Sequence, residues 1–589
     1  MKRAPKPVAL NIFLLKDRKT IAPKASEWTE EEIIHKPISA PKNKRPLKLR
    51  RVELGNDGSL GILLFKQSPA HTPDWLAFLK EGLAPNSRKL DSLSNQSVSA
   101  LLLTKAAERQ FILAFGHGRH LIDQSCVEHR FGLMTVLNSV SPDQIASIDK
   151  QTFDATPKLS RTQTVRTASI TEYEIDVEQD MLRAVVGVTK EEYADDLGDV
   201  LAGIDSLKTT VSVDLARLRK LLKVAFARSQ AKDYLKRRNG QENPFSWVDN
   251  FQPVSDQDEI RELDTKLWEA ISQGNLTNIW MSVPEITEWQ DIKGFAYTSN
   301  QITADDLPQI LEVSDFRKTF RSDASLETLK KRNIHVVSST GLPPRTMSAY
   351  KCLYFEHKGK NSSHILHAGS WYSIESKFEN RINAYFSKIP RIAFSLPFVP
   401  YKHKDEGAYN RAVAKSPNSG YVMLDRKLVQ FGGGYSKIEV CDLMRKKSKS
   451  TKGSLVHVKR GKSSSSLSHL FAQGLVSSTL LASEKSFIDK VNAQLLANGS
   501  SALKGPVAGK DYEVVYAIVD GAPGAQLEIP FFSKVNLEST CKRLRLLGYD
   551  VKLLHIPVTP TRKSVRKSTK KVGSKTATTK RATKKKGAG

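Results

Sequence analysis

Short apolar runs separated by polar segments mark the N-terminal part of the chain. Four runs rich in apolar residues predict strands: Val8–Leu15, Gly61–Lys66, Val98–Thr104 and Gln110–Phe115. Between them, Pro73–Glu81 predicts a helix, because a proline stands near its first turn and Trp75, Phe78 and Leu79 share one face. We therefore expect an N-terminal α/β domain over residues 1–155.

The middle of the chain changes to helical spacing. One apolar stripe consists of Leu215, Leu218, Leu222, Ala225 and Phe226. A second stripe, from Ile260 to Ile271, follows Ser255 and Asp258, which resemble a capping box at the start of a helix. Such stripes are typical of helices packed against a core, and we expect a mostly helical region over residues 175–335.

Candidate strands return after Pro344 and alternate with helical patterns. The strands are expected at Tyr350–His357, Ser363–Ile374, Gly420–Leu424, Lys437–Leu443, Ser454–Arg460 and Glu513–Val519. The helices are expected at Glu375–Phe386, Ser465–Leu481 and Leu537–Leu547. This alternation predicts a C-terminal α/β domain over residues 345–558, and the whole chain is expected to have a mixed α/β fold.

The last segment, residues 559–589, has a composition that cannot form a core. From Thr561 to Gly589 there are twelve Lys or Arg residues and no acidic or aromatic residue. We expect this tail to be disordered by itself and to bind along phosphates without reading bases.

The charge of the chain narrows the class of partner. The sequence holds 91 Lys and Arg against 62 Asp and Glu, a net charge of +29. An excess of this size favours nucleic acid, most simply double-stranded DNA, over a basic protein without a special ligand or one drawn to an anionic membrane. No run approaches the ~20 apolar residues of a membrane-spanning helix, so we expect no membrane association. The 4 cysteines stand far apart without a CxxC pair, which fits a reducing cytoplasm.

The residues that could carry chemistry cluster around one predicted hairpin, formed by Lys437–Leu443 and Ser454–Arg460. A turn near Lys449 places Asp442 opposite residues 456–457, and strand alternation then brings Asp442, His457 and Lys459 to one face. The same alternation places Glu439 on the opposite face. Outside the hairpin, a preceding helix could supply Glu406 as a second carboxylate, while Asp425, at a strand end, reads as a salt bridge or turn cap.

Carboxylates and a lysine in this arrangement suit phosphodiester hydrolysis. Carboxylates hold Mg²⁺ or Mn²⁺, which neutralises charge on the phosphate, and a nearby lysine orients the attacking water and stabilises the transition state. Basic residues beside the site and in the tail are the expected nucleic-acid contacts: Arg445, Lys446, Lys447, Lys449, Lys452, Arg460, Lys462, Lys563, Arg566, Lys567, Lys570 and Lys571.

This set of residues resembles the PD-(D/E)XK nuclease superfamily, which has an acid on a helix, an acid on one strand and (D/E)-x-K on the next. The resemblance implies that Glu406 and Asp442 bind the metal, that Lys459 is the catalytic lysine and that Gln473, on the following helix, assists. His457 departs from the motif, which has Glu or Asp there. It either serves as a third metal ligand, suited better to Mn²⁺ or Zn²⁺ than to Mg²⁺, or marks a degenerate domain that only binds.

Segments spread along the whole chain carry a second resemblance: FILAFGHGRHLI, FGLMTVLNSV, GSWYSI, IEVCDL, LVHVKRG, LSHLFAQG and PFFSKVNL. They resemble a sporadically distributed bacterial family of unknown function, for which a role against phage and other foreign DNA is implied. Together the two resemblances imply a DNA-binding defence protein with a restriction-endonuclease-like C-terminal domain that is a metal-dependent phosphodiesterase. The alternatives are a non-catalytic DNA-binding protein with a degenerate nuclease-like fold and an interaction scaffold in a defence system.

Overall fold

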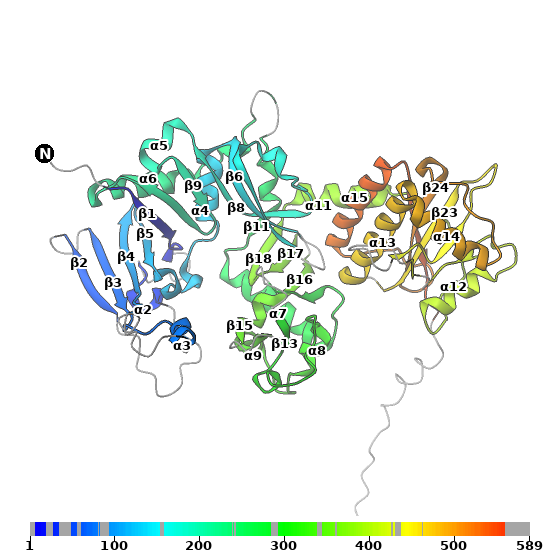
Figure 1. Ribbon diagram of the computed structural model, residues 1–589, viewed down its shortest axis with the longest axis horizontal. Helices are drawn as coiled ribbons and strands as arrows, with labels where there is room; N and C mark the ends of the chain where they lie inside the picture. The colour runs from blue at the N-terminus through cyan, green and yellow to red at the C-terminus, as the bar shows by residue number, and fades with distance from the viewer. Residues whose placement is uncertain are drawn as a thin grey trace, which may run out of the picture. The chain divides into compact units, whose positions relative to one another are not determined.

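The chain folds into two compact units that combine helices and sheets (Figure 1), which confirms the expected mixed α/β class. The computed structural model describes residues 6–18, 27–34, 49–55, 60–80, 82, 93–152, 158–237, 240, 243–283, 292–338, 344–359, 362–425, 428–429, 438–461 and 463–559. Unit 1 comprises Met1–Lys388, Ser463–Ser468 and Ile529–Ser539, and unit 2 comprises Ile389–Lys462, His469–Glu528 and the chain from Thr540 on. The basic tail predicted for residues 561–589 lies outside the described residues.

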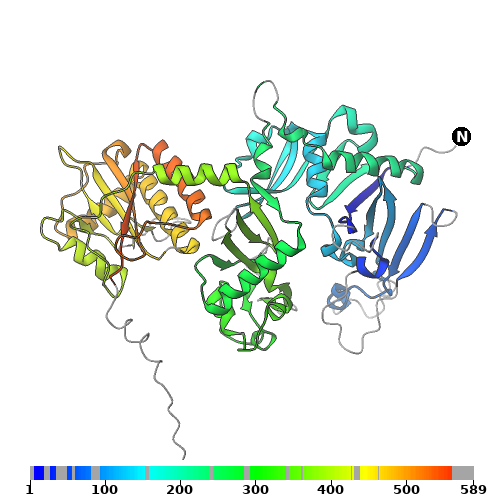
Figure 2. The ribbon, with the colours of Figure 1, turned by 180° about the vertical axis from the view of Figure 1, so that it is seen from behind.

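A ten-stranded sheet, antiparallel throughout, forms the largest part of unit 1 (Figure 2). In spatial order its strands are β2 (Arg50–Leu54), β3 (Gly61–Gln67), β4 (Val98–Ala106), β5 (Arg109–Gly116), β1 (Val8–Leu14), β10 (Ser206–Val211), β9 (Val200–Gly203), β8 (Asp180–Thr189), β6 (Val140–Thr152) and β7 (Leu159–Ala168). The helices that share its core or precede its strands are α3 (Asp74–Lys80), α4 (Phe131–Ser139), α5 (Glu191–Leu197) and α6 (Leu215–Gln230).

Helix α6 shows how the apolar stripe found in the sequence is used. Asp214 caps the helix by accepting a hydrogen bond from the backbone N–H of Arg217. Leu218, Leu222 and Ala225 are buried in the core that α6 shares with the sheet, whereas Leu215, the first residue of the predicted stripe, is exposed. The stripe therefore begins one turn later than the periodicity predicts.

The expected domain boundaries differ from those in the structure. Residue 155 falls between β6 and β7, which are paired neighbours in one sheet, and β8, β9 and β10 lie in the region expected to be mostly helical. Strand β8 (DMLRAVVGVT) is buried along most of its length. Because apolar residues face both sides of it, the sequence lacks the alternation that marks a strand with one solvated face.

Two smaller antiparallel sheets complete unit 1. One has the order β11 (Phe251–Pro253), β18 (Ser370–Ile374), β17 (Ser363–His367), β16 (Leu353–Lys358) and β12 (Ile279–Met281), and the other β13 (Ile292–Ala296), β14 (Asn333–Ser338) and β15 (Arg345–Ser348). Their helices are α7 (Gln257–Gln273), α8 (Val313–Lys318), α9 (Leu326–Lys331) and α11 (Ser376–Lys388). Helix α7 is capped by Asp256 and not by Ser255 as predicted, because Asp256 accepts the backbone N–H groups of Asp258 and Glu259.

Unit 2 contains a five-stranded mixed sheet with the order β19 (Val422–Met423), β22 (Leu443–Arg445), β23 (Gly453–Arg460), β24 (Tyr512–Val519) and β25 (Asp550–Ile556). Strands β22 and β23 form an antiparallel hairpin at the predicted turn, with Leu443 paired to Val456, but β22 shares only Leu443 with the predicted strand Lys437–Leu443. Strands β23, β24 and β25 run parallel. A separate two-stranded sheet pairs β20 (Leu428–Val429) with β21 (Ile438–Glu439). Helices α12 (Glu406–Ala414) and α14 (Lys485–Ala497) belong to unit 2, as do the later parts of α13 (Ser464–Ser483) and α15 (Phe531–Leu546).

The two faces of this sheet have different neighbours. Tyr409 and Val413 of α12 share a core with Val456 and Val458 of β23. On the other face, Tyr516 of β24 donates a hydrogen bond to a backbone carbonyl of α13. Alternate residues of β23 therefore point either toward α12 or toward α13, and this division decides which side chains can meet at the end of the strand.

Candidate functional site

The candidate site lies where β22 stops covering the edge of β23. The last link between the two segments is the backbone N–H of Asp442, which donates to the carbonyl of Val456 at 3.0 Å. Beyond this point side-chain carboxylates, and not backbone carbonyls of a neighbouring strand, accept the hydrogen bonds of β23. The N–H of Val458 donates to Asp442 Oδ2 at 2.7 Å, and the N–H of Arg460 donates to Glu406 Oε1 at 2.8 Å. These N–H groups are two residues apart and face the same edge, so the two carboxylates lie side by side along it.

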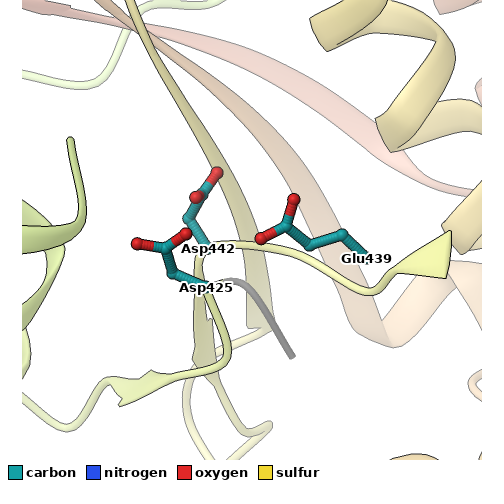
Figure 3. A group of neighbouring side chains, drawn as sticks. All are labelled: Asp425, Glu439 and Asp442. Carbon is teal, nitrogen blue, oxygen red and sulfur yellow. The ribbon is translucent and has the colours of Figure 1, made fainter. Parts of the chain in front are cut away.

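Three carboxylates converge at this place (Figure 3). Asp425 follows β19, Glu439 ends β21 and Asp442 directly precedes β22, and one oxygen from each lies within 4.8 Å of those of the other two. Because β22 is antiparallel to β23, this position is the carboxyl-terminal end of the parallel strands β23, β24 and β25. Open sheets commonly bind ligands at that end.

Two neutral amide side chains hold the carboxylates. Asn410 of α12 donates through Nδ2 to Asp442 Oδ1 at 3.1 Å and to Asp425 Oδ2 at 3.3 Å, and Gln473 of α13 donates to Glu439 Oε2 at 2.6 Å. Asn410 is fully buried, and its Oδ1 has no hydrogen-bond partner among the described residues. The amides position the carboxylates but bring no positive charge, so the negative charge of the cluster is not neutralised by them.

Burial and mutual repulsion change the titration of the most enclosed carboxyl group. Burial raises the pKa of Asp442 to about 8; the hydrogen bond from Val458 opposes this shift, and the negative charges of Glu439, Asp425 and Glu406 add to it. Among the described residues Asp442 makes no ion pair. Three carboxylate groups whose oxygens lie this close together suit a hard divalent cation such as Mg²⁺ or Mn²⁺.

Lys459 and Glu406 form an ion pair beside this cluster, with Lys459 Nζ 3.3 Å from Glu406 Oε2. Their side chains are 30% and 28% exposed, so both remain open to solvent while Asp442 is buried. The sequence predicts that Glu406, Asp442 and Lys459 lie near one another and that Gln473 follows on the next helix. The structure brings these four residues together, although Gln473 contacts Glu439 and not Asp442.

His457 does not join them. Its side chain is fully buried, its ring packs against Tyr516, and neither ring nitrogen has a hydrogen-bond partner among the described residues. Burial lowers the pKa of His457 to about 3, so the ring is neutral. Since Val456 and Val458 face α12, His457 between them faces α13. The predicted meeting of Asp442 and His457 on one face is therefore wrong, because Asp442 lies in a bend and its carboxylate turns along the strand edge.

Asp425 and Glu439 belong to the cluster although the sequence did not predict them as ligands, and the reasons differ. The predicted strand Lys437–Leu443 is broken: β21 ends at Glu439 and β22 begins at Leu443, so alternation does not run through residues 440–442. Glu439 therefore lies beside Asp442 and not on the opposite face. For Asp425 a signal was present, since a carboxylate directly after a strand, as here after Gly420–Leu424, stands where sheets commonly bind ligands.

The basic residues of the hairpin turn lie at the other end of β23. Its eight residues place Gly453 about 23 Å from Arg460. Several of the turn's cations are engaged: Lys447 pairs with Asp511 at 2.6 Å, Lys452 with Asp550 at 2.5 Å, Arg445 lies 3.9 Å from Glu513, and Lys446 donates to Ser501 at 2.8 Å. Lys449 is exposed and Arg460 lies at the carboxylate end. Lys462 and the predicted tail contacts Lys563, Arg566, Lys567, Lys570 and Lys571 lie outside the described residues.

Comparison with known proteins places nearly the whole chain in one sequence group. A sequence model of a family described as a family of unknown function (DUF6119) matches residues 10–557. No curated protein and no solved structure matches the chain. Within the part of the chain that the structure describes, no helix has the length and apolar character needed to cross a lipid bilayer.

Proposed function

The chain belongs to the DUF6119 family of unknown function, and we propose that its unit 2 binds a divalent cation and hydrolyses phosphodiester bonds in nucleic acid. The observation that carries this proposal is the convergence of Asp425, Glu439 and Asp442 within 4.8 Å, with Asp442 buried. Such crowding of negative charge is costly without a cation, and oxygen ligands of this kind select Mg²⁺ or Mn²⁺. The resemblance to the PD-(D/E)XK superfamily supports the reaction class.

Each residue of the site has a distinct task in this proposal. The three carboxylates hold the cation, which supplies charge neutralisation at a phosphate and a more acidic bound water. Asn410 and Gln473 keep Asp442 and Glu439 in place through their amide groups. Lys459, held by Glu406 at 3.3 Å and open to solvent, stabilises the negative charge that develops on the phosphate during attack.

A purely structural role explains only part of this arrangement. Asp442 and Glu406 bind the N–H groups of Val458 and Arg460, which would otherwise be unpaired at the strand edge. Two carboxylates are enough to pair the N–H groups at this edge of β23, yet Asp425 and Glu439 also lie near it. Asp425 and Glu439 raise the pKa of Asp442, so their placement works against a cap and favours a cation site.

One observation favours a second candidate, a nucleic-acid-binding protein without catalysis. The position of the motif that usually carries an acid holds His457, which is buried on the far face of β23 and contributes nothing to the carboxylate cluster. In this alternative the basic residues still bind nucleic acid, but the addition of a divalent ion does not lead to strand cleavage. Response to the metal therefore separates the two candidates.

Cleavage assays test the proposal directly. The purified protein is incubated with plasmid DNA, and in parallel with single-stranded DNA and RNA, in Mg²⁺, in Mn²⁺ and in EDTA. We expect strand cleavage in a divalent ion only and a loss of at least 100-fold for Asp442→Asn. The control is Asp550→Asn, the same change in a carboxylate of the same sheet that pairs with Lys452 at the opposite end. Cleavage that persists in EDTA, or that both variants lose equally, would refute the proposal.

A role in defence against foreign DNA would follow from this activity. If cleavage protects a host, expression of the wild-type protein lowers the plating efficiency of phage, whereas Asp442→Asn does not. Equal protection by both proteins would separate defence from hydrolysis and favour the binding-only alternative.

A further inference from the structure

We propose that the loop Tyr401–Lys404, together with Arg460, is the surface that holds the phosphate backbone of nucleic acid beside the carboxylates. This inference rests on the proposed function for the identity of the ligand as a phosphodiester chain. It replaces the hairpin turn, residues 445–452, as the main binding surface of unit 2.

The loop is fixed to the carboxyl-terminal end of the parallel strands. The N–H of Tyr401 donates to the carbonyl of Pro557 at 2.7 Å, and the N–H of Thr559 donates to the carbonyl of Tyr401 at 2.9 Å. The Tyr401 side chain is buried, and the guanidinium of Arg460 lies 5.3 Å from the centre of its ring. This places Arg460 and the loop at one location on the sheet.

Burial alternates along the loop and turns its lysines outward. Tyr401 is buried and His403 is half-buried, with the His403 ring 5.7 Å from that of Tyr409, whereas Lys402 and Lys404 are exposed. Neither lysine makes an ion pair with an acid in the part of the chain that the structure describes. The neighbouring Asp405 accepts the backbone N–H of Ala408 as the cap of α12. Two cations therefore remain available to a phosphate.

Two lysines of the hairpin turn, in contrast, already form ion pairs with acidic residues of the chain. Lys447 and Lys452 are each within 2.6 Å of a carboxylate, on Asp511 and Asp550. A phosphate would have to compete with these partners, so the counterion release that drives nucleic-acid binding is reduced there. The turn also lies about 23 Å from the carboxylates along β23.

The loop, in contrast, adjoins the proposed site. Lys404 precedes Glu406 by two residues, and Glu406 binds both the N–H of Arg460 and the ammonium group of Lys459. A backbone held by Lys402, Lys404 and Arg460 thus passes next to the carboxylates. The loop also pairs with Thr559, and the twelve basic residues of the tail begin three residues later, at Arg562.

Salt titration of nucleic-acid binding tests this inference on the full chain. Fluorescence anisotropy of a labelled duplex is measured in EDTA, so that no cleavage occurs, for the double variant Lys402→Ala with Lys404→Ala. Each phosphate contact contributes about 0.9 to the slope of log K against log salt, so the slope should fall by about 1.8. The matched control, Lys447→Ala with Lys452→Ala, removes the same number of charges and should leave the slope unchanged.

The outcomes distinguish this inference from the proposed function. A slope that falls for the turn variant and not for the loop variant, or for neither, overturns the inference whatever the cleavage assay gives. If the salt slope falls as expected for the loop variant, but no divalent ion supports cleavage, the loop is confirmed as the binding surface and the proposed hydrolysis is refuted. If vesicles of phosphatidylserine displace the duplex through Lys402 and Lys404, the ligand is a membrane and the inference fails.

Discussion

Replacing Asp442 by Asn should make the metal-free protein more stable at neutral pH, although it removes a hydrogen-bonded residue. The pKa of Asp442 is 3.8 in the unfolded chain and about 8 in the fold. A carboxyl group with a higher pKa in the folded chain lowers stability as pH rises between these values, because the unfolded chain releases its proton first. Each pH unit in that window costs about 1.4 kcal/mol, so about 4 kcal/mol is lost between pH 4 and pH 7.

The Asn side chain avoids this loss because it does not ionise. Its carbonyl oxygen can still accept the N–H of Val458, while the contact with Asn410 must change. Asn410 has an unpartnered Oδ1, and rotation of its amide group turns that oxygen toward the new donor, at a cost of about 1 kcal/mol. The net gain of about 3 kcal/mol corresponds to roughly 6–12 °C in the melting temperature of a unit of this size.

Calorimetry in EDTA, at pH 5 and at pH 7.5, measures this gain. All seven tryptophans lie in unit 1, so the transition seen by tryptophan fluorescence serves as an internal control and should not move. Mg²⁺ or Mn²⁺ at 100 times its dissociation constant should add about 2.7 kcal/mol to the wild type and nothing to Asp442→Asn. The reasoning is refuted if the variant melts below the wild type at pH 7.5, or if the metal shifts both proteins equally.

Four further changes probe the rest of the site and the tail. Lys459→Ala should lower kcat by about 100-fold with little effect on duplex affinity measured in EDTA, because it acts on the transition state; an equal loss in both would make it a binding residue. Glu439→Gln should weaken Mn²⁺ binding at least tenfold in calorimetric titration, whereas His457→Leu should leave it unchanged, and the reverse result would restore the histidine as a ligand. Deleting Thr561–Gly589 should flatten the salt slope of duplex binding by about five, if half of its twelve charges contact phosphates, without changing either melting transition. Identical slopes would show that the tail does not engage nucleic acid.

Strands and the central hairpin could be predicted from the sequence where the side-chain period was regular. Ser454–Arg460 and Glu513–Val519 match β23 and β24 to within one residue at each end, and the pairing of Leu443 with Val456 agrees with the predicted turn. The proximity of Asp442, Glu406 and Lys459 followed from the order of these elements. For the strands and the turn, local pattern was sufficient because neighbours in the chain determine it, whereas the contact between Glu406 and Lys459 joins residues 53 positions apart.

The parts of the site and of the fold that the sequence did not predict depend on features that leave no pattern in the neighbouring residues. The three-residue break between β21 and β22 moves Glu439 to the side of Asp442, and no periodicity reports such a break. His457 appeared to be a ligand because its register with Asp442 was correct, yet a bend at Asp442 directs the two side chains apart. In unit 1, the doubly buried strand β8 lacked the alternation that identifies a strand, so a sheet was read as part of a helical region.

The carboxylates that cover the open edge of β23 also bear on self-association of the protein. An uncovered strand edge presents a row of N–H and C=O groups to which a strand of another molecule can add, and inward-facing charges prevent such addition. Asp442 and Glu406 occupy the N–H groups of Val458 and Arg460 with side chains that a second strand cannot readily displace. The edge beside the proposed cation site is thereby protected against intermolecular strand pairing by the same two side chains.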